Sequence, residues 1–171
     1  MGSLVRGIKG AANWLEHLQR WAGLASGLFI TILMLITVYE VVMRYLLRLP
    51  TGRTQEVEQY YLLVGVVFFA IGFTLLEEGH VTVDLVVSKL PPRVQLVMDG
   101  VIASTIIIVF AILLIWGGVV LAARHQTATT PVTRMPLFVG YIMIPIGSFL
   151  LLLQAVIRLI KKVSLLRSTK T

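Results

Sequence analysis

The chain of 171 residues is 57% hydrophobic and only 13% charged, whereas a soluble domain typically has roughly 25% charged residues, so the composition argues against a soluble protein. The formal net charge is +7, but the basic residues lie at the ends of apolar runs and in the tails, where they indicate membrane topology and contact with membrane lipids, with no nucleic-acid partner. The chain has no cysteine, which excludes disulfides, thiolate metal sites, c-type haem and cysteine nucleophiles.

Four uncharged apolar runs dominate the sequence. They cover residues 21–39, 59–76, 100–123 and 135–157, and a helix that crosses a bilayer needs ~20 mostly apolar residues. We therefore predict an all-α integral membrane protein with four transmembrane helices, at about 21–44, 57–77, 96–123 and 136–160. The predicted organisation is a cytoplasmic N-terminal segment of residues 1–20, a four-helix membrane domain of residues 21–160 and a basic cytoplasmic tail of residues 161–171.

Residues 3–20 show the pattern of an amphipathic helix. Apolar side chains recur at helical spacing on one face, and the opposite face is polar and basic; the apolar set is Leu4, Ile8, Ala11, Leu15 and Leu18. We expect this helix to lie in the membrane interface with its apolar face toward lipid. Because no continuous apolar segment precedes residue 21, we expect the first span to be retained as a signal anchor.

The first span ends in two ionisable residues, Glu40 and Arg44, which are four positions apart. They share a helix face and can form an ion pair. Three interpretations of Glu40 are kept open: a structural pair with Arg44, a pair with another subunit, or a proton-coupling carboxylate, since ionisable groups in membrane helices are functional candidates.

The second span begins after two acidic residues, Glu56 and Glu58. Acidic residues in a first helical turn favour the helix macrodipole, and the same residues are candidates for contact with a partner. The following loop has an apolar stretch too short to cross a membrane. We predict a short interfacial segment there, between spans 2 and 3, in which His80 and Asp84 share a face if it is helical.

The third loop, residues 124–134, is rich in threonine and polar, so we expect it to be exposed. Pro136 suits the first turn of the fourth span. Pro145 lies well inside that span, where proline removes a backbone hydrogen bond and bends a helix. We therefore predict a kink at Pro145.

The distribution of basic residues predicts the orientation. Ten of the fifteen Lys and Arg residues lie in the N-terminal segment, the second loop and the C-terminal tail, and five lie in the first and third loops. Because cytoplasmic segments carry an excess of Lys and Arg, this bias places both termini in the cytoplasm.

The chemistry-bearing residues do not form the sites of a self-contained enzyme or transporter. All three histidines lie outside the spans, whereas a di-haem cytochrome needs histidine pairs within its helices. No span is broken in its middle by paired Gly and Pro, as substrate-binding helices of transporters often are. We predict no catalytic residue, no metal site and no cofactor, and an accessory subunit is the better interpretation.

Short motifs at the span ends resemble a known family. They are Arg44-Tyr45, the acidic pair Glu56 and Glu58, Gly79-His80-Val81 with Val83-Asp84, Leu90-Pro91, and Tyr141 with Ile144-Pro145-Ile146-Gly147. In this order and spacing the chain resembles the small membrane subunit of TRAP (tripartite ATP-independent periplasmic) transporters. It departs from the family pattern at Glu40, often Asn, and at Glu77 and Glu78, where a basic residue is common.

The resemblance implies a non-catalytic scaffold subunit of a multi-pass complex in the bacterial inner membrane. Its partners are a large multi-span permease, which carries the transport domain and sodium sites, and a periplasmic substrate-binding protein that docks transiently and delivers an organic anion, often a carboxylate. We expect the permease interface to include Glu40, Arg44, Tyr45, Glu56, Glu58, His80 and Asp84. We expect the periplasmic docking surface to include Arg48, Arg53, Arg124, His125 and Arg134.

The sequence leaves two other classes of function open. A small proton-coupled multidrug exporter would be a homo-oligomer that uses Glu40 and is active without a permease. A membrane assembly factor would have no transport role and would bind other partners.

Overall fold

The computed structural model describes residues 2–48, 52–77, 94, 97 and 101–168. Side chains are described from residue 13 to residue 164 within these ranges. The interfacial segment predicted between spans 2 and 3, with His80 and Asp84, and the predicted start of span 3 near residue 96 lie outside the described residues.

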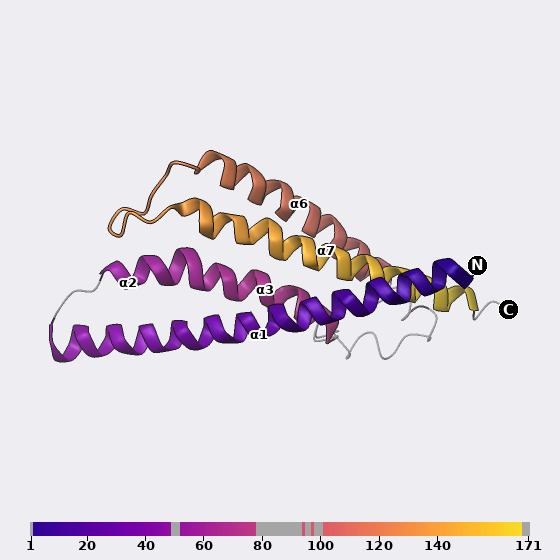
Figure 1. The fold of residues 1–171 in the computed structure, drawn as a ribbon, viewed down its shortest axis with the longest axis horizontal. Helices are drawn as coiled ribbons and strands as arrows, with labels where there is room; N and C mark the ends of the chain where they lie inside the picture. The colour runs from indigo at the N-terminus through magenta and orange to yellow at the C-terminus, as the bar shows by residue number, and fades with distance from the viewer. Residues whose placement is uncertain (1, 49–51, 78–93, 95–96, 98–100, 169–171) are drawn as a thin grey trace.

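Four long helical segments make up the described chain (Figure 1). The first is α1, Gly2–Leu46. The second consists of α2, Gly52–Val57, a π-helical turn η1, Glu58–Leu62, and α3, Leu63–Leu76. The third and fourth are α6, Ala103–Arg124, and α7, Leu137–Ser168. Each segment contains a stretch long and apolar enough to cross a membrane, which confirms the predicted all-α membrane fold with four spans.

The N-terminal amphipathic segment and the first span form one continuous helix, because α1 runs from Gly2 to Leu46 without a break near residue 20. The apolar face that we expected to lie on lipid is packed against the chain itself at Leu15, which is 3% exposed. One turn further on, the Gln19 side chain is fully buried and its Nε2 donates to the Leu150 carbonyl of α7. This end of α1 therefore lies against α7.

The helices form an open layer in the order α6, α7, α3, α1 (Figure 1). The small apolar core lies between α3, α6 and α7, and contains Leu75, Ala111, Leu151 and Ala155. By contrast, only 6% of the most apolar window of α1 is buried within the chain, compared with 28% for α7. The outer face of α1 is therefore left for lipid or another subunit to cover.

Glycines allow the helices of this layer to approach closely, as small residues commonly do in membrane proteins. Gly140 and Gly147 of α7 face the backbone carbonyls of Tyr60 and Phe68, so a Cβ at either position would meet main-chain atoms. Gly118 of α6 faces Pro145, which lies inside α7 without ending the helix. The kink at Pro145 stays a prediction.

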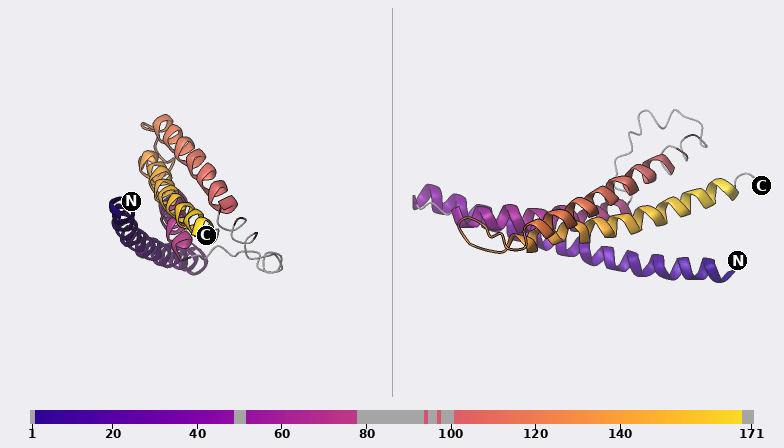
Figure 2. Two further views of the ribbon diagram at one scale, coloured as in Figure 1. Left: turned by 90° about the vertical axis from the view of Figure 1, so that its right-hand side faces the viewer. Right: turned by 90° about the horizontal axis from the view of Figure 1, so that it is seen from above.

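The N-terminal end of α1 and the C-terminal end of α7 lie at one end of the layer (Figures 1 and 2). An ion pair between Glu16 and Lys161, with 3.5 Å between Oε1 and Nζ, joins them. The C-terminal end of α1, the start of α2 and the α6–α7 loop, residues 125–136, lie at the other end (Figure 1). The Glu16–Lys161 ion pair and the α6–α7 loop thus lie at opposite ends of the layer.

Candidate functional site

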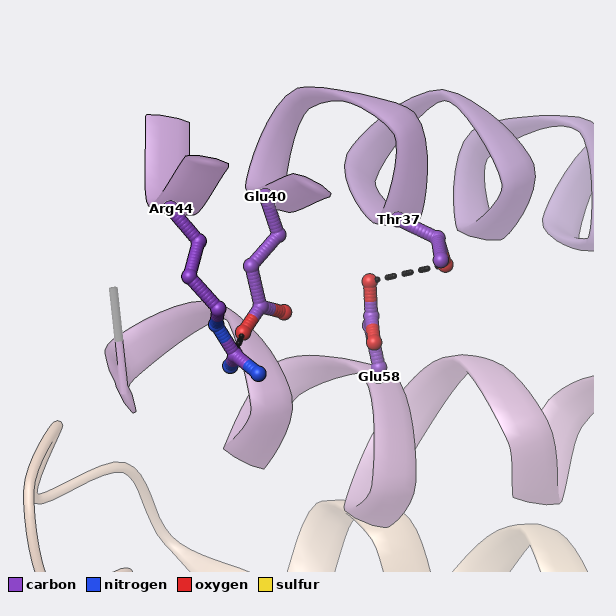
Figure 3. A network of polar contacts seen from close by, with 4 residues as sticks. All are labelled: Thr37, Glu40, Arg44 and Glu58. Carbon is purple, nitrogen blue, oxygen red and sulfur yellow. Dashed lines mark hydrogen bonds and ion pairs between the residues drawn. The ribbon is translucent and has the colours of Figure 1, made fainter. Parts of the chain in front are cut away.

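A polar groove lies between the C-terminal part of α1 and the start of the second helical segment. Its volume is about 280 Å³. In Figure 3 the Arg44 guanidinium lies on the Glu40 carboxylate, and the Glu58 carboxylate points toward Thr37. The groove is lined by Thr37, Glu40, Val41, Arg44, Tyr45, Gln55 and Glu58. It therefore contains four of the residues predicted for a subunit interface: Glu40, Arg44, Tyr45 and Glu58.

The helical repeat of α1 creates one wall of this groove, because positions three or four apart share a face. Thr37, Glu40 and Arg44 follow this spacing. Arg44 Nη2 donates to Glu40 Oε1, which confirms the predicted ion pair. Across the groove, Thr37 Oγ1 lies 3.1 Å from Glu58 Oε1.

The groove has an excess of negative charge. Glu40 is only 6% exposed, and its partner Arg44 is the single cation among the lining residues, whereas Glu58 adds a second carboxylate. A buried carboxylate is costly unless it is paired or hydrogen-bonded. The geometry therefore suits a positively charged group from outside the chain.

Glu56 lies apart from this groove and acts within the chain. One carboxylate oxygen accepts the Val132 backbone N–H at 2.8 Å. The other accepts both the backbone N–H and the hydroxyl of Thr133, at 2.8 and 2.7 Å. Hydrogen bonds to an ionised acceptor are stronger than neutral ones. Glu56 thus fixes the α6–α7 loop to the start of the second helical segment.

The α6–α7 loop is also held by its own hydrogen bonds. The Thr130 backbone N–H donates to the Met135 carbonyl at 2.9 Å, and the Thr130 hydroxyl accepts the Met135 N–H at 3.0 Å. The Tyr61 hydroxyl donates to the Pro136 carbonyl at 2.8 Å. Thr130 is only 1% exposed, so the prediction of an exposed loop is wrong at this residue. Thr130 can lie inside because its hydroxyl binds the Thr133 hydroxyl and the Met135 N–H, and buried polar groups are normally hydrogen-bonded.

The arginines predicted for docking lie in or next to this ordered loop, just after α1 and in α2. The four exposed side chains are those of Arg48, Arg53, Arg124 and Arg134. The backbones of Arg48 and Arg134 have φ values of 53° and 54°, a conformation unusual for residues other than glycine. His125 differs, since it is half-buried, donates from Nδ1 to the Leu121 carbonyl and packs against Tyr141 with ring centroids 5.1 Å apart.

Several polar residues of the site were not predicted from the sequence. Thr37 and Gln55 line the groove, and Thr130 and Thr133 build the loop that Glu56 holds. For Thr37, the signal available in the sequence was its helical spacing from Glu40 and Arg44. Among the described residues, no group of three or more His, Cys, Asp or Glu side chains is placed to hold a metal ion.

Comparisons with known proteins agree with the sequence motifs and the fold. A search of curated protein sequences gave no significant match. The family model of the DctQ component of tripartite ATP-independent periplasmic transporters matches residues 33–165. This range includes both walls of the groove, the Glu56 contact and the α6–α7 loop, and it covers well over half of the chain. The chain belongs to the DctQ family, the small membrane component of tripartite ATP-independent periplasmic transporters in the bacterial inner membrane.

Proposed function

We propose that this chain is a scaffold subunit that binds the large permease through the outer face of α1 and the adjoining polar groove. The complex imports an organic anion, often a carboxylate, with sodium coupling, and both termini of the chain lie in the cytoplasm. An uncovered apolar helix beside a negatively charged groove is what supports this proposal.

The negative charge of the groove is the main support for the proposed interface with the permease. Two carboxylates, Glu40 and Glu58, accompany one guanidinium, that of Arg44. A Lys or Arg side chain from the permease would neutralise the excess carboxylate when lipid or protein covers the groove. Such desolvated charge pairs fix register and specificity between subunits.

The same arrangement disfavours a self-contained proton-coupled exporter. A coupling carboxylate must be reached in turn from both sides of the membrane, whereas Glu40 lies near one end of α1 and is paired with Arg44. The remaining charged residue of the groove, Glu58, lies at the same end. This placement favours a structural or intersubunit role for Glu40.

The end of the chain with the α6–α7 loop is proposed to face the periplasm and to contribute to docking of the binding protein. The positive charge there comes from Arg48, Arg53, Arg124 and Arg134. Because Glu56 and the threonines order the loop, two of these arginines border a surface of fixed shape. An ordered basic surface is suited to steer a protein with complementary charge.

The interface is tested by co-purification of the tagged chain with the permease in mild detergent. Wild type should retain the permease. Glu58→Lys should weaken retention by about tenfold or more, because it reverses one charge of the proposed pair. Glu77→Lys is the matched control, since Glu77 is exposed and lies at the far end of α3. Loss of the permease from wild type, or equal retention by both variants, would contradict the proposal.

A further inference from the structure

We propose that Arg48 and Arg134 are the anchor residues of the docking surface, and that each binds a carboxylate on the periplasmic binding protein. This inference rests on the proposed docking role of this end of the chain. It goes further, because it separates two anchoring arginines from the other basic residues nearby and states the chemistry of the partner surface. It is based on the backbone conformation of the two residues.

Arg48 and Arg134 are the two non-glycine residues with a positive φ among those that the structure describes. Their φ values are 53° and 54°. In this left-handed conformation the Cβ atom lies too close to the following carbonyl oxygen, a cost that glycine avoids. Residues held in such conformations are concentrated at functional sites, where the side chain justifies the strain.

The backbone around residue 134 needs the left-handed conformation. The Arg134 N–H donates to the Thr130 carbonyl at 3.1 Å, and the Thr130 N–H donates to the Met135 carbonyl at 2.9 Å. The chain thus reverses direction between Thr130 and Met135, and glycine is the usual residue where a tight reversal requires a positive φ. Arginine at this position has no advantage for the backbone.

Arg48 occupies a comparable position, just after a helix. The helix α1 ends at Leu46, and the Leu47 N–H still donates to the Met43 carbonyl at 3.2 Å. A residue in the left-handed conformation commonly follows the end of a helix, and it is usually glycine. Here too the side chain, and not the backbone, accounts for the arginine.

The two guanidinium groups do not bind within the described part of the chain. Both side chains are exposed, and no hydrogen bond or ion pair joins either of them to another described residue. The Glu56 carboxylate, which holds the same loop, already accepts from Val132 and Thr133. The acceptors for Arg48 and Arg134 therefore come from another molecule.

A carboxylate is the partner that fits these groups best, because the planar N–H donors of a guanidinium match its two oxygens. The hydrogen bonds on either side of Arg134 fix its backbone, which reduces the entropy lost on binding. Arg124 differs, since it lies in the last turn of α6, where a basic residue favours the helix macrodipole. Its presence is explained within the chain.

The test measures binding of the periplasmic binding protein to the complex of chain and permease in lipid nanodiscs, together with the thermal unfolding midpoint of each variant. Arg134→Gly should weaken binding about tenfold, the effect of losing a hydrogen-bonded pair between charged groups. It should leave the unfolding midpoint unchanged or raise it, because glycine relieves the backbone strain. Arg48→Gly should behave in the same way. Arg124→Gln should weaken binding by about twofold at most, as expected for a charge that only steers association.

Two results would overturn the inference and leave the docking role standing. Equal weakening by Arg134→Gly and Arg124→Gln would show that only the overall charge of the surface matters. A lower unfolding midpoint in Arg134→Gly would show that the arginine serves the loop itself. By contrast, unchanged binding when Arg124→Glu is combined with Arg134→Glu would refute the docking role, and this inference with it.

Discussion

Glu56 and Thr133, which are 77 positions apart, are joined by two hydrogen bonds to one carboxylate oxygen. The Thr133 backbone N–H and hydroxyl are the donors, and the Val132 N–H binds the other oxygen of Glu56. Together with the bond from the Tyr61 hydroxyl to the Pro136 carbonyl, these contacts hold the α6–α7 loop on the second helical segment, next to the exposed arginines proposed for docking.

Glu56→Gln should loosen the α6–α7 loop. An amide has one acceptor oxygen, and its NH₂ group would face the donors of Val132 and Thr133. Limited trypsin digestion should therefore cleave after Arg134 faster in the variant than in wild type. Glu58→Gln is the matched control, because Glu58 contacts Thr37 and not the loop. Equal cleavage rates in the two variants would show that Glu56 does not order the loop.

Gly118→Ala should destabilise the contact between α6 and α7. A Cβ at residue 118 would lie 2.8 Å from Pro145 Cδ and 2.9 Å from Ile144 Cγ2, and the proline ring cannot rotate away. Overpacking of this kind typically costs about 1–3 kcal/mol. Unfolding of the purified chain in detergent, followed by tryptophan fluorescence, measures the change.

Gly117→Ala is the control for that measurement, since a Cβ at residue 117 meets nothing within 4 Å. It should be neutral or stabilise the helix by about 0.5–1 kcal/mol, because alanine is less flexible than glycine in the unfolded chain. A loss of stability in Gly117→Ala equal to that in Gly118→Ala would mean that the Pro145 contact does not limit the packing.

The orientation can be tested directly, because the chain has no cysteine that would interfere with labelling. Thr127→Cys places a thiol in the α6–α7 loop, and Ser164→Cys places one near the end of α7, both at exposed positions. A membrane-impermeant maleimide added to spheroplasts should label Thr127→Cys and label Ser164→Cys only after lysis. The reverse pattern would place the termini in the periplasm.

Charge reversal around the α6–α7 loop should impair uptake. Arg124 and Arg134 are exposed, and Arg124→Glu combined with Arg134→Glu changes the sign of that surface. Uptake should fall at least several-fold when the binding protein is limiting and recover at a high concentration of it, because docking is weakened and transport is not. Unchanged uptake at limiting binding protein would refute the docking role.

The spans and the Glu40–Arg44 pair were predictable because both depend on local spacing. A run of ~20 apolar residues is explained by a membrane span, and residues four apart on a helix are neighbours. The continuity of α1 was harder to predict. The charged residues near position 20 mark the change from a polar to an apolar environment, and the helix does not end there. No proline lies between Gly2 and Leu46 to end it.

The Glu56 contact was not predictable from one sequence. Helical periodicity shows which residues share a face, but it does not show which loop packs against that face 77 residues later. The threonines of the α6–α7 loop looked like a solvated polar run. Thr130 is instead buried because its hydroxyl binds the Met135 N–H inside the loop.

Reconstitution in proteoliposomes tests the scaffold role most directly. The purified chain alone should show no transport. The chain together with its permease and binding protein should take up the organic anion when a sodium gradient is applied, and uptake should be lost without the chain. Transport by the chain alone that is driven by a proton gradient and abolished by Glu40→Gln would contradict the account and establish a self-contained exporter.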